Sequence, residues 1–490
     1  MTKTEKQESD SAGDGATSSS PSAPNAGALS RRDFLRSAAA VGSGLALTGK
    51  ALGQDAPEIK PQQAPSLSSP PSSDTLNIAL IGCGLQGEVL MEAARRIQSE
   101  AGNPTVRFKA ACDIYPYNLR LVSGRLKACG QPVNAYEDYR EMLHKEKDLD
   151  AVIVATPDWM HAEHAIACME AGYHVYCEKT MSNSLEKARR MVWTARRTGK
   201  LLQIGYQRRS SPRYLHAINN VAHGNRFLGR ICQANAQWNR AKMEDMGWVK
   251  KYEVSPEKLA KYGYDSMHQL RNWRWFRKYG GGPVVDLGSH QIDVFNWVFK
   301  GNPTSVMAGG GIGYYKNREW PENVMAMLEY ATPEGKACAL CQVLTTSSYG
   351  KYYEAFMGEN ATLRISELSY GTMVVVERHV DREERDKWVE AGVLREAMAG
   401  ERVTTPSGEI AVIEAIESPP GMPTLWDIPI TLLKPYHQYH LENFFSAILH
   451  GTPLNCPPEI GYESAVAALA VNKALEAGKT IHFKPEDFKV

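Results

Sequence analysis

The chain has 490 residues, of which 43% are hydrophobic and 23% charged, so it is long and apolar enough to bury large cores. Its 56 Lys and Arg residues balance its 55 Asp and Glu residues, which argues against a nucleic-acid partner. We expect two folded domains behind an N-terminal segment of different composition.

Residues 1–28 consist mainly of Ser, Ala, Gly and Pro, a composition that cannot bury enough apolar surface to become ordered. The segment 30–53 begins with Ser30 and the paired arginines 31 and 32, followed by Asp, Phe and Leu, continues in a short, mildly apolar run, and ends in the small-residue site 51–53. It resembles a twin-arginine (Tat) signal peptide, which implies cleavage after Gly53. We therefore expect a periplasmic or otherwise exported protein, with the Tat translocase as a transient partner.

Residues 54–75 are rich in Pro and Ser and are predicted to be a linker. Beyond them the sequence has no run of ~18 apolar residues, so we expect no membrane span in the mature protein. The nine cysteines are odd in number and lie mostly in apolar runs, which favours buried thiols. Cys338 and Cys341 lie three apart in a strand-like run, where they would face opposite sides. We expect them to pack, and we expect no metal site.

The folded part begins with a unit typical of dinucleotide-binding domains. Residues 76–81 form an apolar run of strand length that leads into Gly-Cys-Gly-Leu-Gln-Gly at 82–87, and a helical pattern follows. Gly82 permits a tight turn, Gly84 lets backbone N–H groups approach a pyrophosphate, and Gly87 lets the helix pack against the strand. The helix N-terminus then faces the phosphates with its partial positive charge.

A second predicted strand, 106–112, ends at Asp113, whose carboxylate is placed to accept hydrogen bonds from the adenosine ribose. The same carboxylate would repel a 2'-phosphate, which favours NAD over NADP. Strands and helices then alternate, with helices at 136–143, 159–171 and 185–198 and strands at 150–155, 174–177 and 201–205. This alternation predicts a parallel sheet covered on both faces, a Rossmann domain over 76–209.

Ligands of such sheets bind at the carboxyl ends of the strands. The residues expected to contact the dinucleotide are therefore Gly82, Gly84, Leu85, Gln86, Gly87, Asp113, Thr156, Pro157, Glu178 and Lys179.

The sequence resembles the Gfo/Idh/MocA superfamily of sugar and inositol oxidoreductases. The matching segments, in the family's order, are the glycine turn at 82–87, the Thr-Pro segment at 155–161, Glu-Lys-Thr at 178–180 and the Gly-rich segment at 280–290. The resemblance implies a second, α+β domain over 210–490 with a large, mainly antiparallel sheet, which binds substrate and forms a homo-oligomer, a dimer or a tetramer. Thr180 replaces the proline of the family's motif. Proline often supports a cis peptide bond, which is costly before threonine, so the sequence does not predict the backbone conformation of this turn.

Apolar patterns support this second domain. They predict strands at 231–238, 303–308, 324–330 and 337–345, and closing helices at 436–449 and 462–477. The charged and aromatic insert 243–271 carries no recognisable motif.

Asp286 and His290 are four residues apart, so on a helix they would share a face and converge on one substrate hydroxyl. By resemblance, His290 is the general base and Asp286 is its electrostatic and hydrogen-bonding partner. Lys179 would stabilise the negative charge that develops on the substrate oxygen. Taken alone, Asp286 is better explained as a helix cap after Gly280 to Gly282, and His290 as an interior histidine; the family resemblance is what favours the catalytic roles.

Four further side chains could form a platform for a sugar through stacking and bidentate hydrogen bonds, namely Arg208, Arg209, Trp273 and Arg274. The alternative is that this cluster serves packing or a subunit contact.

These observations favour an exported NAD(P)-dependent oxidoreductase that acts on a hydroxyl of a sugar, polyol or glycoside and retains its cofactor. The first alternative is an NAD-dependent, redox-neutral glycosidase that oxidises, eliminates and re-reduces within one cycle. The second is a non-catalytic cofactor-binding protein, which the presence of Lys179, Asp286 and His290 argues against.

Overall fold

The computed structural model describes residues 75–98, 105–224, 227–368, 371–396, 402–404, 410–412 and 424–490. The expected signal segment, 1–53, and the linker up to residue 74 lie outside this part of the chain. None of the helices in the described part is both long and apolar enough to cross a membrane.

The first domain is built on a six-stranded parallel sheet with the order β3-β2-β1-β4-β5-β6. Its strands are β1 (Thr75–Ile81), β2 (Thr105–Cys112), β3 (Asn134–Tyr136), β4 (Ala151–Val154), β5 (His174–Cys177) and β6 (Leu202–Ile204). The central strand β4 is apolar and buried throughout, and β1 is buried from Ile78 on, as expected for a sheet covered on both faces. The strand order reverses between β1 and β4, where doubly wound sheets bind ligands.

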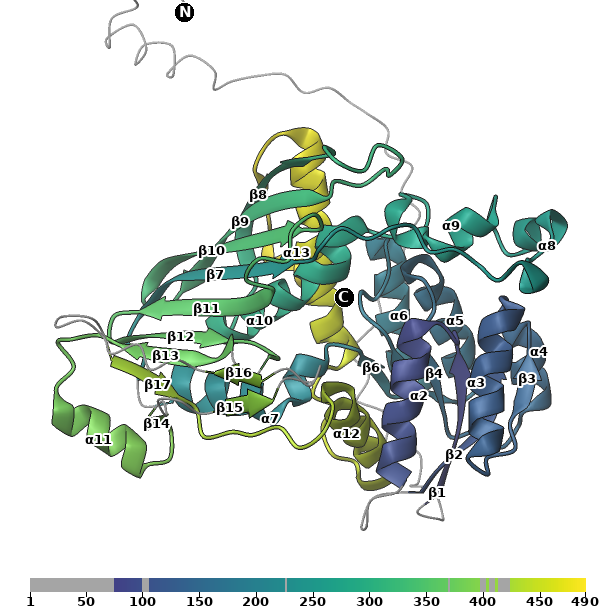
Figure 1. Cartoon of the computed structure of the whole chain (residues 1–490), viewed down its shortest axis with the longest axis horizontal. Helices are drawn as coiled ribbons and strands as arrows, with labels where there is room; N and C mark the ends of the chain where they lie inside the picture. Colours follow the sequence, from purple (N-terminus) through teal and green to yellow (C-terminus); the bar gives the residue numbers. More distant parts are fainter. Residues whose placement is uncertain are drawn as a thin grey trace, which may run out of the picture. The chain divides into compact units, whose positions relative to one another are not determined.

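The helices of this domain lie on the two faces of the sheet (Figure 1). They are α2 (Leu85–Gln98), α3 (Pro116–Ala128), α4 (Tyr139–Lys145), α5 (Asp158–Glu170) and α6 (Leu185–Thr198). The prediction of one helix over 136–143 was partly wrong, because β3 takes Tyr136 and α4 starts only after Asp138, whose side chain accepts a hydrogen bond from the Arg140 N–H. Helix α3 was missed because few of its residues are buried, so its apolar pattern is weak.

The second domain contains a ten-stranded sheet with the order β14-β17-β13-β12-β11-β7-β10-β9-β8-β18, in which only β7 and β10 pair in parallel. Its longer strands are β7 (Ile231–Asn239), β8 (Pro303–Gly311), β9 (Asn323–Thr332), β10 (Gly335–Leu344), β11 (Tyr352–Gly358) and β12 (Ala361–Ile365). The shorter ones are β13 (Met373–Val376), β14 (Arg395–Glu396), β17 (Thr424–Asp427) and β18 (Ile481–His482), while β15 (Arg402–Thr404) and β16 (Ile410–Val412) pair separately. The predicted α/β fold with a mainly antiparallel second sheet is confirmed.

Helices α10 (Ser289–Phe299) and α13 (Pro458–Ala477) pack on one face of this sheet (Figure 1). In β9 and β10 the buried residues alternate with exposed or half-buried ones, as the period of two predicts. Cys341 is accordingly buried and Cys338 is half-exposed, and all nine cysteines are free thiols. The opposite face carries exposed apolar side chains, namely Met307, Met325, Met327 and Leu340.

Two connections tie the second domain to the first. The chain leaves β6 through η1 (Gln207–Ser210), α7 (Pro212–His216) and η2 (Ala217–Ala222). Near the C-terminus, α12 (Tyr436–His450) returns to pack on α2, and its Leu441, Phe444 and Phe445 join the core of the first domain. A domain boundary after residue 209 therefore does not divide the chain into two separate cores, because α12 belongs to the core of the first domain.

Arg208 and Arg209 belong to this connection, which corrects the expectation that they contact the sugar. Arg208 is fully buried and pairs with the buried carboxylate of Glu354, which also accepts a hydrogen bond from the Tyr214 hydroxyl at 2.8 Å. The Arg209 Nη2 lies 2.9 Å from a carboxylate oxygen of Asp293 in α10. Buried carboxylates hold both guanidinium groups in the interior, because an unpaired buried charge is costly.

The close packing of Gly87 against the backbone of Gly82 can be tested by its effect on stability. A Cβ atom at Gly87 would lie 1.9 Å from the backbone oxygen of Gly82, so Gly87→Ala must push α2 away from β1. We expect a loss of ~1–3 kcal/mol in the free energy of unfolding, measured by urea denaturation. Gly124→Ala is the matched control, because no atom lies within 4 Å of that Cβ in α3 and alanine favours helix. Equal effects of the two substitutions would contradict this account of the turn.

Candidate active site

A cavity of about 1000 Å³ lies at the carboxyl ends of the strands of the first sheet and extends to residues of the second domain. Its volume is at the upper end of the range for small-molecule sites. The turns after β1, β2, β4 and β5 form one side, and the segments 238–246 and 261–290 contribute to the other.

The turn after β1 has the geometry of a phosphate cradle. Gly82 has a φ of +94°, which favours glycine, and its N–H donates to the Cys112 carbonyl at 2.8 Å. A Cβ at Gly84 would meet only Asn118 Nδ2, at 3.8 Å, so this backbone is open to a close ligand. Gly84, Leu85 and Gln86 line the cavity, and the last two form the N-terminus of α2. These features fit the pyrophosphate of a dinucleotide.

Asp113 lines the same cavity and also holds the glycine turn in place. Its two carboxylate oxygens accept hydrogen bonds from the Cys83 and Tyr115 backbone N–H groups, each at 2.7 Å. Burial raises the pKa of this carboxyl group, while the two backbone donors oppose the shift. Sequence reasoning assigned Asp113 to the ribose and missed this second, structural role.

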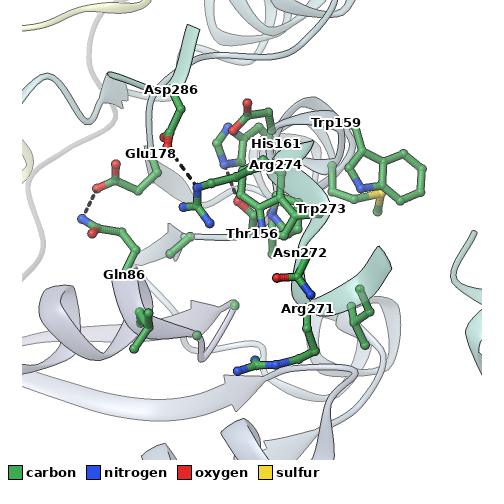
Figure 2. Close-up of a pocket in the computed structure, with 18 of the residues that line it drawn as sticks. Gln86, Thr156, Trp159, His161, Glu178, Arg271, Asn272, Trp273, Arg274 and Asp286 are labelled. Carbon is green, nitrogen blue, oxygen red and sulfur yellow. Dashed lines mark hydrogen bonds and ion pairs between the residues drawn. The ribbon is translucent and has the colours of Figure 1, made fainter. Parts of the chain in front are cut away.

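Thr156 and Pro157 line the cavity between β4 and α5. The ring nitrogens of His161 lie 2.7 Å from the Thr156 carbonyl oxygen and 2.8 Å from that of Thr180, so this histidine joins the loops after β4 and β5 (Figure 2). Lys179 and Thr180 are joined by a cis peptide bond, and the Thr180 hydroxyl donates to the Val285 carbonyl at 3.1 Å. Threonine thus replaces the family's proline while its side chain bonds to the second domain.

Gln86 connects the start of α2 to two other elements. Its Nε2 donates to Glu178 Oε1 at 3.0 Å and lies 3.0 Å from Nε2 of His437 in α12 (Figure 2 shows the bond to Glu178). His437 also lines the cavity and was not among the residues predicted to form the site. No local signal identifies it, because its partner is 351 positions away in the chain.

Lys179, at the end of β5, meets Asp286, in η5 (Val284–Gly288), across the two domains. The Lys179 Nζ donates to Asp286 Oδ1 at 2.9 Å and also to the Asp286 backbone carbonyl. The Arg274 Nε donates to the other carboxylate oxygen at 3.1 Å (Figure 2). Burial alone would raise the pKa of Asp286, but the Lys179 and Arg274 cations hold it well below its ordinary value of 3.8.

His290 stands one turn further on, in the first turn of α10, and lines the cavity. Its ring stacks on Trp238, with 5.4 Å between centroids, and meets the edge of Tyr206 at 5.8 Å. Burial, together with the charges of Lys179 and Arg208, lowers its pKa well below 6.5, so the imidazole is neutral at pH 7. Its Nδ1 is buried with no hydrogen-bond partner among the described residues.

The predicted trio thus lines one cavity, and the charge of Asp286 acts on His290 as expected, but the expected hydrogen bond between these two side chains is not found among the described residues. Both carboxylate oxygens of Asp286 are engaged by Lys179 and Arg274, so Asp286 orients Lys179 and influences His290 only through its charge. Arg274 lies over the ring of Trp273, 4.3 Å from its centroid, and both line the cavity. These two remain candidates for contact with the sugar.

Asp158, the first residue of α5, is a titratable group that sequence reasoning did not select. It is buried in the wall of the same cavity. Burial first, and the nearby Asp286 carboxylate second, raise its pKa to about 7, while Lys179 and Arg274 oppose the shift. A carboxyl group that titrates near neutrality beside a lysine is typical of a catalytic site.

Comparison with known proteins agrees with this geometry. Residues 76–206 match a family model described as the oxidoreductase family with an NAD-binding Rossmann fold, and residues 224–364 match the GFO/IDH/MocA C-terminal domain. A glycosyl hydrolase family 109 protein of Shewanella baltica is 27% identical over 307 residues, which is 60% of this chain and 62% of that protein. An alpha-N-acetylgalactosaminidase of Shewanella oneidensis is 26% identical over the same shares. The chain thus spans about three fifths of the length of these relatives.

Solved structures show the same fold. A levoglucosan dehydrogenase in complex with NADH has a TM-score of 0.59 at 19% identity, covering 84% of this chain and 99% of that one. The WlbA dehydrogenase from Bordetella pertussis, in complex with NADH and UDP-GlcNAcA, has a TM-score of 0.58 at 18% identity over the same shares. Together the two family matches cover more than half of the chain. The protein therefore belongs to the Gfo/Idh/MocA family of NAD-binding oxidoreductases.

Proposed function

We propose that this protein oxidises a hydroxyl group of a sugar, polyol or glycoside with an NAD that it holds tightly. The observation that carries the proposal is that Lys179, Asp286 and a neutral, buried His290 line the same cavity as the glycine turn. An alcohol oxidation needs a base for the hydroxyl proton and a cation for the oxygen, and this wall supplies both.

Each of the side chains in this wall has a separate role in the oxidation. His290 accepts the proton of the substrate hydroxyl, because burial keeps its ring unprotonated at neutral pH. Lys179 uses two of its three ammonium donors on Asp286, which leaves the third for the substrate oxygen. Trp273 and Arg274 contact other parts of the sugar. Bound NAD, held at the glycine turn, supplies the hydride acceptor.

The relatives named as glycosidases favour a second candidate, the redox-neutral glycosidase cycle. That cycle begins with the same oxidation and then needs an additional acid or base at the substrate. Asp158, with a pKa of about 7, is available in the cavity for this role.

We also propose that the enzyme is exported and that it forms a homo-oligomer. The twin-arginine-like segment supports export, and outside the cytoplasm we expect no soluble pool of nicotinamide cofactor, so the protein must retain its own. The exposed Met307, Met325, Met327 and Leu340 on one sheet face support a homo-oligomer that covers this apolar surface.

The proposal is tested by purifying the protein without added cofactor. We expect near-stoichiometric nicotinamide dinucleotide in the purified protein, and turnover of a suitable glycoside or substrate pair without supplementation. Mass spectrometry of the products from a panel of glycosides then separates an oxidised sugar from a released aglycone. Purification as a stable empty protein, with activity proportional to added NAD, would overturn the retained-cofactor proposal.

The pH dependence tests the roles of Lys179 and His290. A base with a lowered pKa remains neutral until the pH falls below 6.5, so the acid limb of kcat/KM should lie below that value. Lys179→Met removes a cation that lowers the pKa of His290, so the limb should move to higher pH while turnover falls by roughly 10²–10³ fold. The control is Lys109→Met, at a surface lysine paired with Asp148. An unmoved limb with near-normal turnover would refute these roles.

A further inference from the structure

The insert of the second domain crosses to the first domain. Between β7 and η5 the chain forms η3 (Lys250–Tyr252), α8 (Pro256–Lys261), α9 (Met267–Arg271) and η4 (Trp273–Trp275). Figure 1 shows α8 and α9 away from the second sheet, beside the helices of the first domain. Here Val254, Leu259, Tyr264 and Met267 bury their side chains in a small core that also contains Tyr115.

Three anchors fix the insert to loops that follow strands of the first sheet. After β2, the Tyr115 hydroxyl accepts a hydrogen bond from the Val249 N–H at 3.1 Å. After β3, Glu137 accepts a hydrogen bond from the Tyr262 hydroxyl at 2.9 Å and forms an ion pair with Lys258.

The third anchor lies at the start of α5, directly after the Thr156-Pro157 turn. The indole N–H of Trp159 donates to the Tyr264 hydroxyl at 3.2 Å, and the two rings meet edge to face. Gly263 packs so closely here that a Cβ atom would lie 2.7 Å from the Trp159 ring. The insert is thus attached beside the residues predicted to bind the dinucleotide.

The inner side of the insert faces the cavity. Its lining residues include Tyr262, Gly263, Tyr264, Leu270 and Arg271. Figure 2 shows Arg271 extending from the insert into this pocket. The Arg271 guanidinium lies over the Tyr115 ring, 5.1 Å from its centroid, and its Nε donates to the Gly247 carbonyl at 3.2 Å.

Arg271 is therefore held at the end of β2, where Asp113 stands. The guanidinium has five N–H donors, and the contact with Gly247 uses one of them, at Nε. The others can reach a ribose or phosphate oxygen of a dinucleotide at this end of the cavity. Both carboxylate oxygens of Asp113 already accept backbone hydrogen bonds. The Arg271 guanidinium would therefore add a second polar contact to the dinucleotide at this position.

We propose that the insert, residues 243–271, forms a clamp, the outer wall of the dinucleotide site, with Arg271 as its polar contact to the adenosine half of the cofactor. The dinucleotide can then leave only when the anchors at Tyr115, Glu137 and Trp159 release. This inference rests on the proposed function in that it explains how an exported enzyme retains its NAD. It predicts slow dissociation, since differences in affinity arise mostly from the off-rate.

The experiment measures the release of NADH from the loaded full-length protein, followed by its fluorescence after addition of excess NAD. Tyr264→Phe removes one anchor by deleting a single oxygen atom, and Lys258→Ala with Tyr262→Phe removes another. Each should raise the dissociation rate constant by about tenfold or more, with a smaller effect on association. Arg271→Met should do the same. Lys250→Ala is the matched control, because among the described residues the contacts of this exposed lysine, with Glu253 and the Trp248 ring, all lie within the insert.

A second measurement uses the unmodified protein, so that a folding defect cannot mask the result. Hydrogen exchange with and without NADH should show added protection of the amides at 246–272. Unchanged release from all the variants, or no added protection, would overturn the clamp. If the proposed function failed instead, the unmodified protein would hold NADH behind a protected insert and still oxidise no sugar hydroxyl.

Discussion

The ion pair between Lys179 and Asp286 is the interaction on which the site depends. Its two members come from different domains, and their side chains are only 12% and 14% exposed. A buried charge without a partner costs several kcal/mol, so neither domain can shift far from the other without a large penalty. His290 follows Asp286 by one turn, and this pair therefore also fixes the imidazole relative to the glycine turn.

Further buried pairs hold the same arrangement. Arg208 with Glu354 and Arg209 with Asp293 join the segment after β6 to the second sheet and to α10. The Ser464 hydroxyl of α13 also donates to Asp293 at 2.7 Å. Arg208 and Arg209 directly follow Gln207, which lines the cavity, so these pairs hold that part of the wall in place, as preorganised catalysis requires. The insert adds lining residues such as Tyr262 and Arg271, so both domains contribute to the walls of the cavity.

Local signals made the first domain predictable from sequence. The glycine spacing, the alternation of strands and helices, and the motifs around Lys179 and His290 involve residues close together in the chain. The strands β7 to β10 and the helices α12 and α13 were also predictable, because their apolar periods are clear. Helix α3 was missed, because a weakly buried helix leaves little pattern.

Contacts between residues far apart in the chain explain the remaining differences between the expected and the observed roles. Arg208 meets a carboxylate 146 positions away, and nothing in the sequence separates Glu354 from a surface glutamate. Likewise, the engagement of Asp286 by Lys179 and Arg274, and the packing of the insert on Tyr115 and Trp159, depend on the folded arrangement. A motif identifies the residues of a site, but the role of each residue depends on the side chains that it contacts in other helices and strands.

The central claim is that hydride passes from a sugar carbon to a nicotinamide held beside Lys179 and His290. The most direct measurement is a single turnover of the loaded protein with a glycoside deuterated at all its ring carbons, quenched before completion. We predict that deuterium appears on the protein-bound nicotinamide, whether the final product is an oxidised sugar or a released aglycone. Product formation with no deuterium on the dinucleotide would contradict the account.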